Sequence, residues 1–246
     1  MQVNLLGPVE VVGSDGVPLS LSPTQQVLVS VLALRSPHIV QTDHLVETLW
    51  STDPPASPYT VLRNHVKRLR KRLGPELAQT VRSGTSGYWL AVDRSTVDAF
   101  AFGDAYDAGS AALAAGKTSE AAAALGWALG LWRGPALGAI NSPALDPDRR
   151  RLEASRVEAI KMNLELQLGF GRHRQVAAEL VELQRLYPFD ERLGALAMAA
   201  LERCGRRSEA LGVYADLRLG LSRTLGIAPA ASTQRDFEAI LRGEPV

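Results

Sequence analysis

The sequence is poor in cysteine and in long apolar runs. Cys204 is the only cysteine among 246 residues, so no disulfide can form within the chain, and an intracellular protein is expected. The apolar run at residues 27–34 is interrupted by Ser30. A membrane-spanning helix needs about 18–20 apolar residues. The first residues, MQVNLLGPVEV, lack the basic start of a signal peptide. We therefore expect a cytoplasmic protein that is not inserted in a membrane.

Motifs of common enzymes and metal sites are also missing. None of the four histidines has metal-ligand spacing with cysteine or carboxylates, and no nucleophile elbow or HExxH is present. The stretch GKTS at residues 116–119 resembles the end of a phosphate-binding loop. It lacks the glycine required at position 111, which is Ala111, and the strand that should precede it. We therefore predict no enzyme activity, no cofactor and no metal.

One segment lacks negative charge. The whole chain carries 27 basic and 26 acidic residues, but no Asp or Glu lies between Pro54 and Pro75. Six Lys or Arg residues fall between Arg63 and Arg72. Residues 1–97 hold nine basic and seven acidic residues, a net charge of +2, whereas residues 98–246 hold eighteen and nineteen, a net charge of −1. Solvated helix faces usually mix both signs, so a face with one sign indicates an anionic partner.

The basic segment has the period of a helix. Its apolar residues recur every three or four positions and form one stripe: Leu62, Val66, Leu69 and Leu73. The opposite face is polar and basic, with Thr60, Asn64, Lys67, Arg68 and Lys71, and it is flanked by Arg63, Arg70 and Arg72. Ser57 and Pro58 suit the start of the helix, and Gly74-Pro75 its end. Duplex DNA is the densest common anion, and its major groove admits such a helix.

The first hundred residues predict an α+β winged helix-turn-helix domain. The expected order is strands, helix, helix, basic helix and hairpin, in which the basic helix recognises DNA and the hairpin is the wing. The strands are expected at residues 3–6, 9–12 and 17–19. One helix opens at Ser22-Pro23, and the next is capped by Thr42-Asp43. The hairpin is expected at residues 79–82 and 88–92, around a small-residue turn.

This segment resembles the OmpR-type winged-helix effector domain. Val61, the run from His65 to Lys71, and Leu73 match the recognition helix of that family, and Gly87-Tyr88 match the end of its wing. The segments LLGPVEV, TDHLVETLW and the following Asp-Pro-Pro are similar to one branch, the Streptomyces antibiotic regulatory proteins, or SARPs. Because the strands begin at residue 3, we expect no receiver domain before them and no dimerisation driven by phosphorylation.

We predict a division of labour on the basic face. Arg68 is expected to read a base, because it lies mid-face and the OmpR-type pattern places its base-contacting arginine there. Asn64 is suited to adenine, and Lys67 and Lys71 are suited to phosphates. The expected DNA-binding residues are Thr60, Arg63, Asn64, Lys67, Arg68, Lys71, Arg72, Arg82, Thr85 and Ser86. His65, at the border of this face, is expected to pack or to meet a phosphate.

Residues 98–246 predict an all-α domain of tetratricopeptide-like helical repeats. Three similar turns begin at Gly116, Gly171 and Gly205. The last two are 34 residues apart, the period of a tetratricopeptide repeat, and the longer first interval of 55 residues implies an insertion between Trp132 and Asp148. Helical hairpins are expected at about 98–132, 148–186 and 190–225, with a terminal helix near 230–242. Trp127 and Trp132 are expected in the core.

The second domain is similar to the bacterial transcriptional activation domain of SARPs. The similarity is carried by LWRGP at residues 131–135, Tyr187-Pro188, residues 205–211 and LGIAP at residues 225–229. The resemblance implies a transcriptional activator in which two protomers bind direct repeats of double-stranded promoter DNA near the −35 element. It also implies recruitment of RNA polymerase through sigma and other subunits, control of secondary-metabolite biosynthesis, and a nucleoid-associated location. One departure is Ser222-Arg223-Thr224, where relatives usually carry acids.

A second interpretation stays open. The chain can be a protein-interaction scaffold of helical repeats whose winged helix contacts protein and not DNA. The unpaired basic face favours DNA, because a protein-binding winged helix does not need it.

Overall fold

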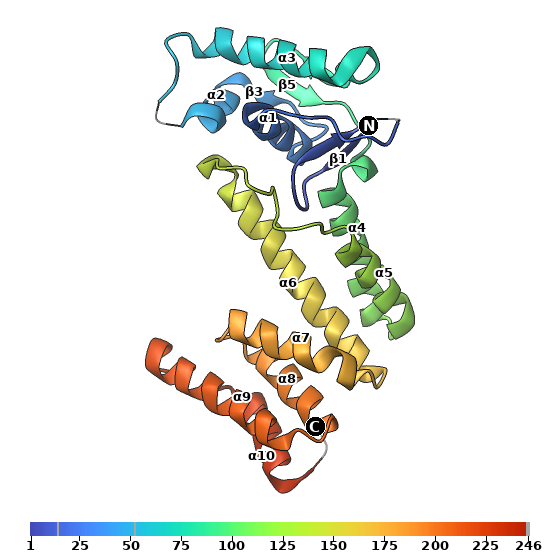
Figure 1. The fold of residues 1–246 in the computed structure, drawn as a ribbon, viewed down its shortest axis with the longest axis vertical. Helices are drawn as coiled ribbons and strands as arrows, with labels where there is room; N and C mark the ends of the chain where they lie inside the picture. The colour runs from blue at the N-terminus through green and yellow to red at the C-terminus, as the bar shows by residue number, and fades with distance from the viewer. Residues whose placement is uncertain (14, 52, 245–246) are drawn as a thin grey trace. The chain divides into compact units, whose positions relative to one another are not determined.

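The computed structural model describes residues 1–13, 15–51 and 53–244, which form two compact units, residues 1–157 and 158–246. Figure 1 shows the elements in chain order. None of the helices in these described ranges is long and apolar enough to cross a membrane. The first unit begins with β1 (Gln2–Asn4), β2 (Glu10–Val12), α1 (Pro23–Leu34), β3 (Val40–Gln41), α2 (Thr42–Trp50), α3 (Pro58–Ala78), β4 (Val81–Ser83) and β5 (Gly87–Leu90).

The first unit contains two small sheets, and the second of them contacts α1, α2 and α3. β1 and β2 are antiparallel, with Val3 opposite Val11, and the second sheet has the order β3-β5-β4. The predicted strand at residues 17–19 is wrong, since only an isolated bridge joins Val12 to Pro18 there. α1 starts as expected, because Ser22 and Gln25 form a reciprocal capping box.

α2 does not start as the sequence predicted. Gln41 and not Thr42 occupies the position before the first turn, and no side chain caps this end of the helix. The backbone N–H and the hydroxyl of Thr42 both donate to the carbonyl of Ser86, at 3.0 and 3.2 Å. Thr42 therefore ties α2 to the hairpin β4–β5. This partner lies 44 residues away in the chain. The local sequence pattern therefore cannot reveal it, and the pattern alone predicts a helix cap.

The remaining helices form antiparallel pairs with the expected boundaries. Each of the three predicted turns contains a glycine with φ of 74–75°, a conformation that favours glycine, at Gly116, Gly171 and Gly205. The pairs are α4 (Asp98–Ala114) with α5 (Thr118–Gly130), α6 (Asp146–Gly169) with α7 (His173–Leu186), and α8 (Glu191–Arg203) with α9 (Arg207–Gly220). A π-helical turn, η3 (Leu221–Leu225), and α10 (Ala231–Arg242) follow. Short 3-10 turns, η1 (Arg94–Thr96) and η2 (Pro143–Leu145), precede α4 and α6.

The insertion predicted between Trp132 and Asp148 packs on the N-terminal strands. The N–H groups of Arg133 and Leu137 donate to the carbonyls of Leu6 and Leu5, each at 2.7 Å. Gly7 sits at this contact with φ +146°, and a Cβ there would come within 2.9 Å of the Arg133 Cβ. The lengthened repeat interval is therefore explained by a loop that belongs to the first unit.

Asp98, the first residue of α4, completes this contact. Its buried carboxylate accepts hydrogen bonds from the N–H groups of Leu5 and Leu6, at 2.6 and 3.0 Å, and lies 3.7 Å from the Arg133 guanidinium. Burial raises the pKa of Asp98, although these donors oppose the shift. The carboxylate thus holds two backbone N–H groups that would otherwise be buried without a partner.

The expectation for the two tryptophans is half wrong. Trp132 lies beyond the end of α5 and packs edge-on against Phe102, with ring centroids 5.4 Å apart, and the Arg156 guanidinium lies 4.6 Å from the centre of its ring. Trp127 is 56% exposed on α5. The spacing of five residues separates the two rings because the helix ends between them.

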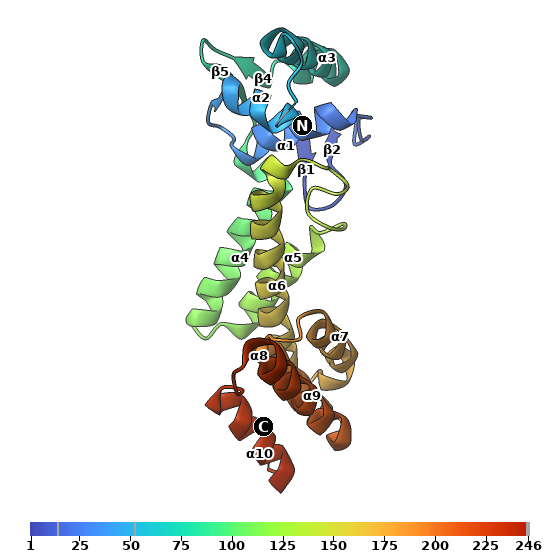
Figure 2. The same cartoon turned by 90° about the vertical axis from the view of Figure 1, so that its left-hand side faces the viewer.

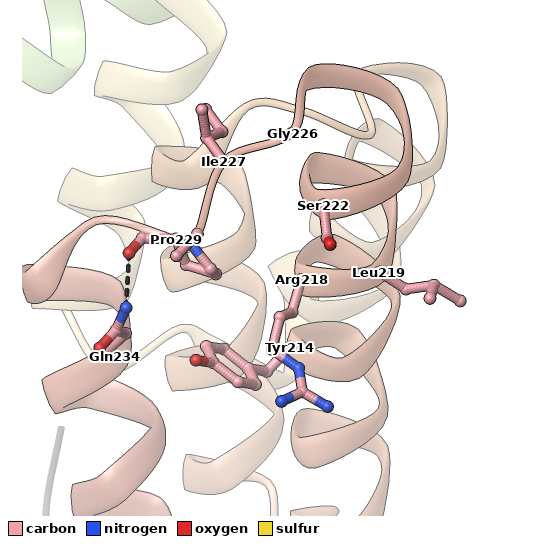
Figure 3. A pocket seen from close by; sticks show the side chains of 9 residues that line it. Tyr214, Arg218, Leu219, Ser222, Gly226, Ile227, Pro229 and Gln234 are labelled. Carbon is pink, nitrogen blue, oxygen red and sulfur yellow. Dashed lines mark hydrogen bonds between the residues drawn. The ribbon is translucent and has the colours of Figure 1, made fainter.

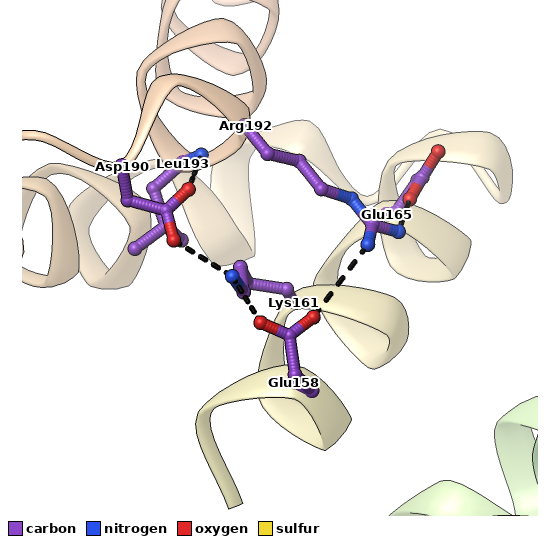
Figure 4. Close-up of polar contacts among 6 residues, drawn as sticks. All are labelled: Glu158, Lys161, Glu165, Asp190, Arg192 and Leu193. Atoms are coloured by element: carbon purple, nitrogen blue, oxygen red, sulfur yellow. Dashed lines mark hydrogen bonds and ion pairs between the residues drawn. The ribbon is translucent and has the colours of Figure 1, made fainter. Parts of the chain in front are cut away.

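In the second unit, a charged cluster joins α6 to the start of α8 (Figure 4). Lys161 is only 8% exposed, and its ammonium group contacts the carboxylates of Glu158 and Asp190, the latter at 2.7 Å. Asp190 also accepts the N–H of Leu193 and so caps α8. Burial alone would lower the pKa of Lys161 and raise that of Asp190, but their mutual contact outweighs it, so the pKa of Lys161 is raised and that of Asp190 lowered.

We expect Asp98→Ala to lower the free energy of unfolding of the first unit by about 3 kcal/mol, because two buried N–H groups lose their acceptor. Asp98→Asn retains one carbonyl oxygen and should lose less. Thermal and urea denaturation of the full chain measure the effect. Asp107→Ala, an exposed acid on the same helix, is the control. If Asp98→Ala and the control had the same free energy of unfolding, the Asp98 carboxylate would not stabilise the fold as proposed.

A fragment of residues 1–97 is expected to fold, because its sheets and three helices share a core. It should melt below a fragment of residues 1–157, which keeps Asp98 and the insertion against Leu5 and Leu6. Circular dichroism of both fragments tests this. An unfolded 1–97 fragment would contradict a domain boundary at residue 97.

Candidate nucleic-acid interface

α3 separates its apolar and basic residues onto opposite faces. Leu62, Val66, Leu69 and Leu73 are buried, and the helix packs against α1 and α2. The helix begins at Pro58 as expected, but the Ser57 side chain makes no capping hydrogen bond. Gly74, with φ 75° and ψ 171°, breaks the helical geometry at the predicted stop, and a short further turn continues to Ala78. Figure 2 shows α3 beside β4, which it contacts.

The predicted DNA-binding residues all lie on the surface. The structure brings six of them together on the outer side of α3, all exposed: Thr60, Arg63, Asn64, Lys67, Arg68 and Lys71. Within the described ranges, no ion pair or hydrogen bond engages the side chains of Arg63, Lys67, Arg68 or Lys71. These four cations therefore face solvent without a counterion from the protein.

The other two cations of the segment are used within the fold. Arg70 is half-buried, and its guanidinium donates to the carbonyl of Val81 at 3.0 and 2.8 Å and to the Ser83 hydroxyl at 3.2 Å. Arg72 donates from Nε to the carbonyl of Ser20 at 2.6 Å. Arg70 therefore braces the wing against α3. Arg72, a predicted DNA-binding residue, is exposed but already holds the loop before α1.

The wing is held at both ends. Arg70 binds its first strand, and Thr42 binds the carbonyl of Ser86 at the end of its turn. Gly87 lies against β3 so closely that a Cβ would fall 2.0 Å from the carbonyl oxygen of Val40. The three predicted wing residues, Arg82, Thr85 and Ser86, are exposed. They are carried by a hairpin whose position relative to α3 is fixed by hydrogen bonds.

His65 packs and does not add charge to the face. Its ring lies 6.1 Å from that of Trp50, between centroids. Burial lowers the pKa of His65, and the charge of Arg68 lowers it further, so both favour the uncharged ring. The sequence missed the internal roles of Arg70 and Thr42, because both depend on partners that are distant in the chain or are backbone groups. One feature of the sequence does point to the internal role of Arg70: it lies at the edge of the basic face of α3 and not at its middle.

Comparison with known proteins agrees with this architecture. Residues 16–90 match the family described as "Transcriptional regulatory protein, C terminal", and residues 97–241 match "Bacterial transcriptional activator domain". "Regulatory protein DnrI" of Streptomyces peucetius is 34% identical over 256 residues, which cover 100% of this chain and 93% of DnrI. The chain belongs to the SARP family. The predicted fold class, an OmpR-type winged helix followed by a helical-repeat domain, is thereby confirmed.

Other relatives of this SARP are longer. "Regulatory protein AfsR" of Streptomyces griseus is 35% identical over 244 residues, which are 99% of this chain but 25% of AfsR. The solved structure "Mycobacterium tuberculosis EmbR in complex with low affinity phosphopeptide" has a TM-score of 0.90 at 30% identity. That alignment covers 100% of this chain and 66% of the EmbR chain. By its family, this SARP is a transcriptional regulator. It spans about a quarter of the length of AfsR and two thirds of the EmbR chain.

We expect Arg70→Ala to loosen the wing of this SARP. Losing the bonds from the guanidinium to Val81 and Ser83 should lower the free energy of unfolding by about 1–3 kcal/mol. It should also speed amide hydrogen exchange in β4 and β5. Hydrogen-exchange mass spectrometry at the wing gives the measurement. Lys71→Ala, an exposed neighbour, is the matched control, and identical exchange in the two variants would show that Arg70 is not a brace.

Proposed function

We propose that this SARP is a sequence-specific activator that binds double-stranded promoter DNA through α3 and the wing. The observation that carries the proposal is the set of four exposed cations on α3 that lack a counterion within the described chain. A protein partner does not require such a face, whereas phosphates relieve the repulsion among these charges. The scaffold alternative, in which the winged helix contacts protein, predicts no salt-sensitive binding to DNA.

The roles of the individual residues follow from their chemistry. Arg68 offers a fork of donors that matches the O6 and N7 atoms of guanine, and Asn64 can bridge adenine. Lys67 and Lys71 are compact charges suited to phosphates. The remaining proposed contacts are Thr60, Arg63, Arg72, Arg82, Thr85 and Ser86. Arg72 contributes its positive charge while its Nε stays bonded to Ser20.

The wider proposal is that two protomers bind direct repeats near the −35 element and recruit RNA polymerase through sigma and other subunits. The support is membership of the same family as DnrI and as "Transcriptional regulator RedD" of Streptomyces coelicolor, which is 33% identical and 72% covered by this chain. We propose control of secondary-metabolite biosynthesis on the same ground. We further propose that residues 1–97 are the DNA-binding domain and residues 98–246 the activation domain, with the protein located at the nucleoid.

Affinity for DNA should fall steeply with salt. If two protomers together neutralise six or more phosphates, the slope of log K against log salt concentration is expected to be about −5 or steeper. Fluorescence anisotropy with the DNA upstream of the protein's own gene gives this slope. Lys117→Ala, which removes a cation outside α3, should leave the slope unchanged. A flat salt dependence of the wild type would rule out the proposed interface.

Arg68→Ala and Lys71→Ala should affect DNA binding differently, because Arg68 is proposed to contact a base and Lys71 a phosphate. Loss of a base contact should cost about 1–3 kcal/mol on the cognate site and flatten the preference at one base position. Loss of a phosphate contact at Lys71 should weaken all sites alike and reduce the salt slope by about one. Binding of both variants to a set of single-base operator mutants separates the two roles. An equal loss of affinity for all operator mutants in Arg68→Ala would show that Arg68 contacts a phosphate. Asn64, Thr60 or the wing would then have to contact the bases.

A further inference from the structure

The second unit contains an open cleft between α9 and α10. Its volume is about 580 Å³, and Figure 3 shows it below the loop of residues 226–229 that connects the two helices. Tyr214, Arg218 and Ser222 line it from one α9 face and the turn that follows, one helical turn apart. Gln234 lines it from α10, where its amide donates to the carbonyl of Pro229 at 2.7 Å.

The cleft has one charge, and that charge has no partner. Arg218 alone is charged among the described residues that line the cleft. Its side chain is exposed, and within the described chain it makes no ion pair or hydrogen bond. In Figure 3 the Arg218 guanidinium lies beside the Tyr214 ring. A positive group without a counterion in a concave site is suited to a carboxylate, which it can bind through two hydrogen bonds.

Apolar side chains are exposed around this charge. Leu219 and Ile227 both line the cleft and are 48% and 50% exposed, so the cleft offers apolar surface beside its one charge. The cleft is also bordered by η3, a π-helical turn, and such turns occur frequently at functional sites. Exposed apolar side chains and a single cation, in a cleft bounded by two helices, offer the two kinds of contact that an amphipathic helix makes.

We propose that this cleft is a docking site for an acidic amphipathic helix of a partner protein, in which a Glu or Asp pairs with Arg218 and apolar residues contact Leu219 and Ile227. The inference is independent of DNA binding by α3, because it concerns another unit of the chain. The choice of an acidic partner rests on charge complementarity. A helix is favoured over a small molecule, because the site is bounded by helices and open to solvent and does not enclose a ligand.

The test uses two synthetic helical peptides with the same leucine stripe, one with glutamates and the other with lysines on the remaining positions. Anisotropy with the full chain should show saturable binding of the glutamate peptide and weaker binding of the lysine peptide. Arg218→Glu should lower the affinity for the glutamate peptide by about tenfold or more and raise the affinity for the lysine peptide. Ile227→Ser should weaken both peptides, because it removes an apolar contact that does not depend on charge.

Arg174→Glu is the matched control, because Arg174 is an exposed arginine of the same unit that does not line the cleft. It makes the same change in net charge and should alter peptide affinity by no more than about twofold. Circular dichroism melting checks that each variant is folded. Absence of saturable binding would overturn the proposal, and so would an equal loss in Arg174→Glu and Arg218→Glu, since that would reflect the overall charge of the unit.

Discussion

The carboxylate of Asp98 is the contact that ties the N-terminal segment to the helices that follow the winged helix. It lies at the first residue of α4, and it accepts hydrogen bonds from the backbone of the N-terminal segment, more than ninety residues earlier in the chain. A buried carboxylate is costly unless its lone pairs are used. Here two N–H groups and a nearby guanidinium use them, so burial of the charge and satisfaction of the backbone are achieved together. The first helical pair is consequently part of the same compact unit as the winged helix.

This contact changes how the two family segments relate to the physical units. The sequence families divide the chain near residue 97, whereas the compact units divide it within α6, at residue 157. The insertion between Trp132 and Asp148 accounts for the difference, because it gives the first helical pair a partner in the winged helix. In the sequence this insertion looks like an irregular repeat. In the structure it binds the first helical pair to the N-terminal segment of the winged helix.

Much of this fold could be predicted from the sequence, because its signals are local. The period of α3, the capping box of α1 and the glycine turns at Gly116, Gly171 and Gly205 each depend on residues within one or two helical turns. The errors involve distant partners. The sequence pattern predicts that Thr42 caps its own helix, but Thr42 binds the Ser86 carbonyl. It also predicts both tryptophans in the core, but of the two only Trp132 packs against Phe102. At the candidate interface, the face was predicted correctly as a surface, but the sequence could not show that Arg70 and Arg72 are engaged by carbonyls.

The contact at Gly87 bears on how the wing can diversify. A side chain there would overlap the Val40 carbonyl, and the first strand of the hairpin is held by Arg70, so the base of the wing has almost no freedom to vary. Gly84 is restrained as well, since its N–H donates to the Gly87 carbonyl at 2.9 Å and a Cβ there would lie 3.3 Å from the Trp89 ring. Thr85 and Ser86 have exposed side chains, and the hydrogen bond from Thr42 engages only the Ser86 carbonyl. New surface chemistry can therefore be introduced at the tip of the wing by ordinary substitution, while the base keeps that tip at a fixed distance from α3.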